Sequence, residues 1–110
     1  MINLTPHAIV LRTQQGDVTL PASGQLARVS MVPTHTGETV AGLPVYRNTP
    51  GPVTGLPRDE RGMIQPCIVS GMVLAAIPPG TPGIYAPDTG PTAVRNEAGH
   101  IVAVTRLLTA

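Results

Sequence analysis

The sequence contains no lysine, phenylalanine or tryptophan, and its only aromatic residues are Tyr46 and Tyr85. A core must therefore be built from aliphatic side chains, whose β-branched members favour strands. Charged residues supply only 12% of the chain, which is about half the usual share. Because 42% of the residues are hydrophobic, the composition excludes a disordered chain, which needs few apolar groups and strong self-repulsion.

The charge balance limits the class of partner. A net charge of +1 argues against a protein that binds nucleic acid polymers, which needs a strongly basic surface. All seven basic residues are arginine, whose planar guanidinium suits phosphate and carboxylate groups. A small, discrete anion is therefore the expected ligand. The scarcity of charge also predicts a homo-oligomer, because the cores of interfaces are depleted in charged residues.

Cysteine usage and hydropathy indicate a protein of the cell interior. Cys67 is the only cysteine, so no intramolecular disulfide can form, and its apolar neighbours predict a structural thiol. The N-terminus lacks the basic region and apolar stretch of a signal peptide. The longest apolar run, residues 67–77, is interrupted by Ser70 and Gly71 and is too short to span a bilayer. We expect a soluble, cytoplasmic protein without membrane contact.

The length predicts a single domain over residues 1–110. The 13 Pro and 12 Gly residues punctuate the aliphatic runs, which predicts short strands separated by sharp turns. Residues 68–70 indicate a central strand that leads into one short helix at about residues 71–77, with Ser70 placed to cap it. The fold class that we expect is α+β, mainly antiparallel β, as a small barrel or curled sheet with that helix.

Two hairpins are expected around short polar turns. The first joins residues 8–11 to residues 18–20, and the second joins residues 92–95 to residues 100–106. Residues 33–66 show the least regular pattern, with only short edge strands expected there.

The loop Pro87–Pro91 is the first candidate for a binding site. Asp88 can accept hydrogen bonds from the backbone two residues on, and Gly90 can adopt a left-handed conformation. These properties describe an ordinary turn equally well. They also allow the Asp88 carboxylate, the Thr89 hydroxyl and bunched N–H groups to meet the ribose and phosphate of one ligand.

Five further residues complete the candidate ligand site. Arg95 and Arg28 can supply charge-assisted contacts to an anion. Asn3 and His7 are expected at the rim of the site, although both also suit a structural turn. Thr54 lies in a Thr-Gly pair between prolines.

Catalytic and metal sites find little support in the spacing of the residues. Ser70, His7 and Asp88 could be written as a triad, but nothing in their spacing supports one. The three histidines are scattered, with no pair at helical spacing. We therefore expect no catalytic residue, no metal and no cofactor.

The chain contains five motif-like blocks. They are Asn3–Val10 (NLTPHAIV), Val53–Pro57 (VTGLP), Ile68–Ser70 (IVS), Tyr85–Arg95 (YAPDTGPTAVR) and Ile101–Arg106 (IVAVTR). In this order they resemble a family of short, largely uncharacterised proteins of bacteriophages, prophages and bacterial genomes. The resemblance covers roughly half of the chain and leaves out residues 33–50. It implies a bacterial host cell but no particular reaction.

A looser analogy concerns function. Bacteriophages encode small, β-rich, oligomeric proteins that sequester the nucleotide signals of bacterial antiviral immunity. The present chain is similar in size and composition, so the analogy implies a non-catalytic, anti-defence sponge for a cyclic dinucleotide or an ADP-ribose derivative. Two alternatives stay open. One is a structural or interaction protein, such as a virion or phage-assembly component, and the other is a small nucleotide hydrolase.

Overall fold

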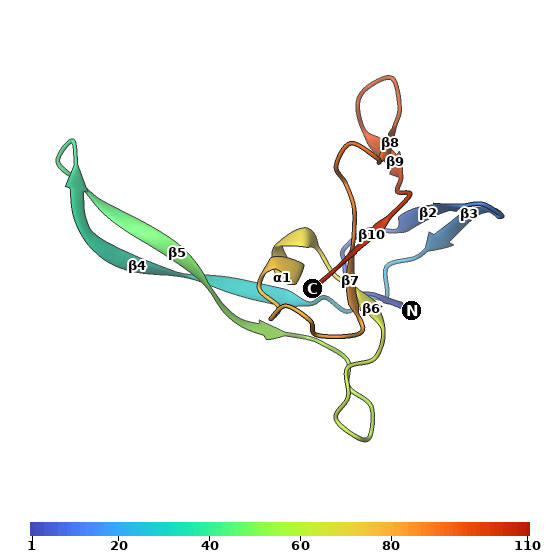
Figure 1. The fold of residues 1–110 in the computed structure, drawn as a ribbon, viewed down its shortest axis with the longest axis horizontal. Coiled ribbons are helices and arrows are strands. Elements are labelled where there is room, and N and C mark those ends of the chain that lie inside the picture. The colour runs from blue at the N-terminus through green and yellow to red at the C-terminus, as the bar shows by residue number, and fades with distance from the viewer.

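A computed structural model describes residues 1–110 and places a small mixed sheet at the centre of the chain (Figure 1). The sheet has the strand order β1-β6-β7-β10. Its strands are β1 (Ile2–Asn3), β6 (Cys67–Ile68), β7 (Ile84–Pro87) and β10 (Leu107–Thr109). β6 runs parallel to both β1 and β7, while β10 runs antiparallel to β7.

The helix α1 (Gly71–Ala75) connects β6 to β7 and explains why these two strands are parallel. A crossover through a helix returns the chain to the end where the first strand began. The Ser70 hydroxyl accepts a hydrogen bond from the N–H of Val73 at 3.3 Å, so the expected N-cap is confirmed. The helix ends two residues earlier than expected. Met72 lies exposed on its outer side, while Val73 and Leu74 are buried.

The prediction of a mainly β fold with one short helix is confirmed, but the barrel or curled sheet is wrong. The strands form one four-stranded sheet and three separate two-stranded hairpins that do not close on one another. The parallel pairing at the centre has a non-local cause, because it depends on where the chain returns after the helix rather than on any turn.

The core lies between this sheet and the helix and is small. Only 13 of the 110 residues are buried. The main cluster combines side chains from the first loop, the central strands and the helix. Its members are Leu4, Cys67, Val69, Val73, Leu74, Ile77, Ile84 and Ala86.

Two short hairpins extend from the sheet where the sequence predicts them. β2 (Ile9–Thr13) pairs with β3 (Gly16–Leu20), and β8 (Val94–Arg95) pairs with β9 (Ile101–Ala103). In the first, Arg12 donates to Asp17 across the strands at 3.0 Å. This hydrogen bond lowers the pKa of the Asp17 carboxyl below its ordinary value.

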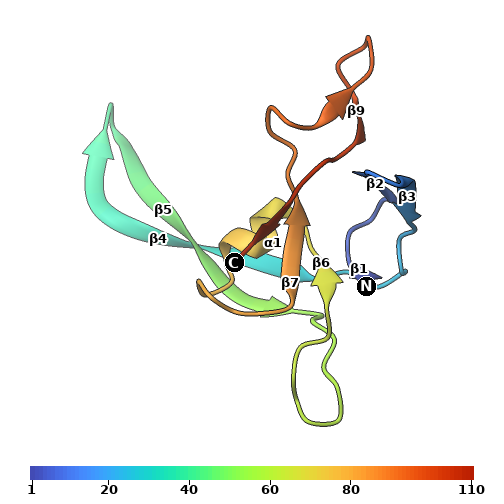
Figure 2. The same cartoon turned by 45° about the vertical axis from the view of Figure 1, so that its right-hand side comes forward.

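The third hairpin is much longer than expected. β4 (Arg28–Val40) has 13 residues and β5 (Leu43–Thr54) has 12, so the stretch predicted to be irregular is the most extended in the chain. In Figure 1 this hairpin, which we call the arm, projects to the left of the body, and Figure 2 shows it clear of the body after rotation.

Four prolines and an exposed setting conceal the arm in the sequence. Pro33, Pro44, Pro50 and Pro52 lie within its strands. Proline is tolerated there because each strand has one partner and one free edge. Both faces of most of the arm meet solvent, so no alternation of apolar and polar residues marks it.

The dimensions describe an extended molecule. The radius of gyration is 17.0 Å, compared with about 13 Å for a compact domain of this length. There are 45 backbone–backbone hydrogen bonds, where a compact domain would have about 75. Much of the main chain therefore lies at unpaired strand edges.

The junction between the arm and the body gives a prediction about stability. Gly55 has φ +87°, and a Cβ there would collide with the main-chain carbonyl oxygen of Leu26. Gly37 has nearly the same φ, +86°, but open space around it. Gly37→Ala should cost about 1 to 2 kcal/mol, from the left-handed backbone alone. Gly55→Ala should cost at least about 1 kcal/mol more, because the clash adds to that strain.

Denaturant unfolding followed by circular dichroism measures both variants. Equal losses of unfolding free energy would show that the contact between residues 26 and 55 does not fix the base of the arm.

Candidate functional site

The loop at residues 86–91 contains the turn that the sequence predicts, and an ion pair besides. Asp88 Oδ1 accepts a hydrogen bond from the N–H of Gly90 at 3.0 Å. Asp88 Oδ2 pairs with the Arg106 guanidinium at 3.1 Å. The N–H of Asp88 also donates to the carbonyl of Arg106 at 3.0 Å. Asp88 Oδ1 thus closes the turn within the loop, while Oδ2 and the main-chain N–H hold the loop against the chain entering β10.

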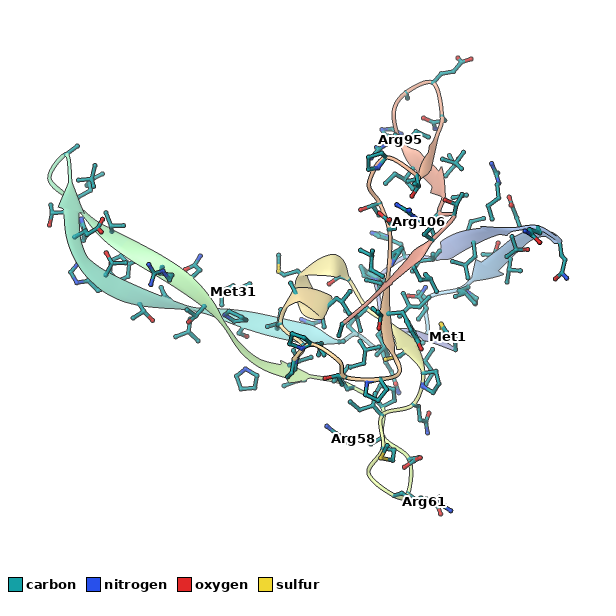
Figure 3. The ribbon with its side chains drawn as sticks, in the orientation of Figure 1. Met1, Met31, Arg58, Arg61, Arg95 and Arg106 are labelled. Carbon is teal, nitrogen blue, oxygen red and sulfur yellow. The ribbon has the colours of Figure 1, made fainter.

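Arg95 holds the other side of the same loop. Its guanidinium donates to the carbonyl of Thr89 at 3.2 Å and to the carbonyl of Gly99 at 2.9 Å. Figure 3 shows Arg95 and Arg106 on the same part of the molecule, near β8 and β10. The structure therefore brings Arg95 to the predicted loop and adds Arg106, which no local sequence pattern links to it.

Asn3 serves the protein rather than a ligand. Its side chain is enclosed, with 2% of the residue exposed. Asn3 Nδ2 donates to the carbonyls of His7 and Leu20 at 2.9 and 3.0 Å. Asn3 Oδ1 accepts from the N–H and the hydroxyl of Thr5 at 3.0 and 2.6 Å. With every polar position occupied, Asn3 ties β1 to both ends of the β2–β3 hairpin.

Arg28 and Thr54 lie on another element. They face each other in the register of the arm, at its base, and both are exposed. No side-chain hydrogen bond joins either of them to the loop at residues 86–91. The eight candidate residues therefore fall into three groups. Asp88, Thr89, Gly90 and Arg95 lie together at the loop, Arg28 and Thr54 lie at the base of the arm, and Asn3 and His7 are joined by a hydrogen bond near the N-terminus.

An apolar groove of about 320 Å³ runs beside the loop, and His7 and Thr89 line it. It lies between the start of β2 and residues 101–104, which include β9. These segments make one parallel bridge, Leu11 to Val104, in which the N–H of Val104 donates to the carbonyl of Val10 at 2.9 Å. Most of the remaining lining is aliphatic. It comprises Ala8, Ile9, Val10, Pro87, Ile101, Val102, Ala103 and Val104.

The remaining reactive groups occupy structural positions. Cys67 is fully buried, and burial raises the pKa of its thiol. The Ser70 hydroxyl is occupied by the helix cap. No three His, Cys, Asp or Glu side chains gather in a way that could hold a metal ion. The Thr92 hydroxyl is the one buried side-chain polar atom without a hydrogen-bond partner.

Comparisons with known proteins give no match to a family, a curated protein or a solved structure. The family resemblance thus stays a prediction. None of the helices is both long and apolar enough to cross a membrane. The arrangement around residues 86–91 offers two guanidinium groups and an apolar groove side by side.

Asn3 gives the prediction that belongs to this geometry. Asn3→Ala should lower the free energy of unfolding by about 3 kcal/mol, because it leaves buried donors and acceptors without partners. Asn96→Ala is the matched control. Asn96 Oδ1 accepts one hydrogen bond, from the N–H of His100, in an exposed turn, and its loss should cost about 1 kcal/mol or less. Chemical denaturation measures the free energy of unfolding of both variants. A loss at Asn3 no larger than that at Asn96 would contradict its structural role and leave Asn3 a candidate ligand residue.

Proposed function

We propose that the chain is an interaction protein that works by self-association, with the arm as its contact element. This is the structural alternative that the sequence leaves open, and a virion or phage-assembly component is the setting that the family resemblance suggests. Symmetric homo-oligomers are the commonest assemblies of soluble proteins.

The surface area of the single chain carries the proposal. The accessible surface is 7476 Å² for a mass of 11.4 kDa. A compact monomer of that mass exposes about 5,800 Å². The excess is about 1,700 Å², whereas a standard interface buries about 800 Å² on each partner. The chain therefore carries enough surplus surface for more than one ordinary interface.

The composition of the arm supports its assignment as the contact element. Between residues 29 and 54 the only charged side chains are those of Glu38 and Arg47. The same stretch exposes five large apolar or aromatic side chains, Met31, Val32, Val40, Leu43 and Tyr46. Low charge with exposed apolar and aromatic groups is typical of interface cores. An isolated two-stranded hairpin is also marginally stable in water, so a partner surface would stabilise the arm.

Light scattering coupled to size exclusion tests this proposal. The wild-type chain should have a mass of at least two chains, each of 11.4 kDa. Replacing residues 33–48 with Asn-Gly joins Val32 directly to its ladder partner Thr49 through a favoured two-residue turn. This short-arm variant should be monomeric and should keep Cys67 protected from thiol reagents.

The control applies the same edit to a different hairpin. Replacing residues 59–63 with Asn-Gly joins Arg58 to its bridge partner Ile64 and should leave the mass of the assembly unchanged. A wild-type mass of 11.4 kDa at high protein concentration would contradict self-association.

A second candidate function is sequestration of a small nucleotide-type ligand in phage anti-defence, such as a cyclic dinucleotide or an ADP-ribose derivative. The observation that favours it is the pair Arg95 and Arg106, which contact the loop at Thr89 and Asp88. Arginine pairs of this kind suit phosphate groups. The groove beside them has room for an apolar or stacked part of a ligand.

Calorimetry with cyclic dinucleotides and ADP-ribose isomers tests the second candidate. Arg95→Lys and Arg106→Lys should each weaken binding by about tenfold, because lysine loses the bidentate fork. Arg61→Lys is the control, because Arg61 lies in an exposed loop and its side chain donates no hydrogen bond. Heating the complex and analysing the small molecule separates the mechanisms, since intact ligand indicates sequestration and altered ligand indicates a hydrolase. No binding across the panel would contradict both.

A further inference from the structure

We infer that the apolar groove between β2 and β9 receives the tip of the arm from a second copy of the chain. The inference rests on the proposed self-association and adds the place where the arm docks. Residues 40–43 form the tip, and residues 8–10 and 101–104 form the two walls of the groove.

The tip is apolar at a position where hairpins are normally polar. Val40 and Leu43 face each other across the tip and are 60% and 68% exposed. The turn between them has positive φ at both central residues, 52° for Ala41 and 81° for Gly42. Such turns favour Asn or Asp at the first position. Ala41 accepts a left-handed backbone instead, which costs about 1 to 2 kcal/mol, and it leaves four consecutive apolar residues facing water.

The strained backbone at Ala41 points to a binding role for the tip. Residues held in unfavourable backbone regions gather at binding and switching sites, where the surroundings compensate for the strain. A polar turn would be more stable for a tip that stays in water. Contact with an apolar partner would remove the side chains of Val40, Ala41 and Leu43 from water, which would offset the strain.

The groove offers matching chemistry. Its walls are largely aliphatic, and Ile101 and Val102 on one wall are exposed, at 39% and 43%. β9 pairs with β8 through Ile101 and Ala103, and the register between the two strands is irregular at the step that holds Val102. The groove can therefore cover the apolar side chains of the tip.

The same chain cannot fill its own groove. The arm extends about 40 Å at the usual rise of a strand, and its tip lies across the body from β2 and β9 (Figures 1 and 2). A second copy must supply the tip. Contact between two different surfaces of one protein closes as a reciprocal pair or a ring, or else continues as a filament.

The surface area of the chain is consistent with this pairing. The groove holds about 320 Å³, and each chain both gives an arm and accepts one. The surplus surface of about 1,700 Å² per chain is close to twice the 800 Å² that one side of a standard interface buries. One donated arm and one occupied groove per chain account for a surplus of that size.

Cross-linking between two single variants tests the contact. Leu43→Cys and Val102→Cys, prepared separately and then mixed, should form a covalent dimer with a short bismaleimide. Leu43→Cys mixed with Met63→Cys is the matched control, because Met63 is an exposed side chain of another loop and should not react with its partner. The native Cys67 is fully buried and should give no product in the wild type.

Charge substitutions give an independent readout. Leu43→Asp should raise the dissociation constant of the assembly by about tenfold or more, because a charge replaces a buried leucine at the contact. Met63→Asp should leave it unchanged. Mixing Leu43→Asp with Val102→Arg should restore association, since each chain then supplies one half of an ion pair.

The outcomes separate this inference from the proposal on which it rests. A monomeric wild type would overturn both. A stable oligomer with no cross-link between residues 43 and 102, and with no response to Leu43→Asp, would overturn only the docking site. An arm-to-arm contact, seen as cross-linking of Leu43→Cys to itself, would also overturn it. A nucleotide could instead occupy the groove. If it protected the cysteine of Val102→Cys from the cross-linker, and Leu43→Asp did not weaken the oligomer, the docking site would also be overturned.

Discussion

The fold depends on main-chain pairing along both sides of the short strand β6. The N–H of Cys67 donates to the carbonyl of Gly83 at 2.9 Å, and the N–H of Val69 donates to that of Tyr85 at 2.7 Å. On the other side the N–H of Leu4 donates to the carbonyl of Ile68 at 2.8 Å. Because this strand is fully enclosed, its hydrogen bonds are shielded from water and hold the first loop, the helix and the last sheet strands together. Every hairpin extends from that centre.

Local signals made part of this fold predictable from the sequence. The cap at Ser70 and the turn at residues 96–99 depend on neighbours along the chain, and both were found. The parallel pairing of β6 was not, because it depends on where the helix returns the chain. The sequence does not reveal the arm, because most of its length buries neither face and therefore shows no hydrophobic period.

The residues of the candidate site show the same difference between local signals, which the sequence reveals, and contacts between distant segments, which it does not. Arg95 was found because it lies close to the loop in sequence, whereas Arg106 reaches Asp88 through a strand that returns from far along the chain. Asn3 was selected for its chemistry, but its burial and four hydrogen bonds assign it to the framework. Sequence could identify residue types suited to anion binding. It could not say which of them already had partners within the protein.

The prolines of the arm have a consequence for solubility. A long, charge-poor hairpin with free edges would ordinarily add strands from other chains and grow into aggregates. Pro33, Pro44, Pro50 and Pro52 each remove a main-chain donor from such an edge. Sideways growth of a continuous sheet is therefore interrupted at three positions along β5 and at one position along β4. The prolines thus limit edge-to-edge pairing of the arm without covering its exposed apolar side chains.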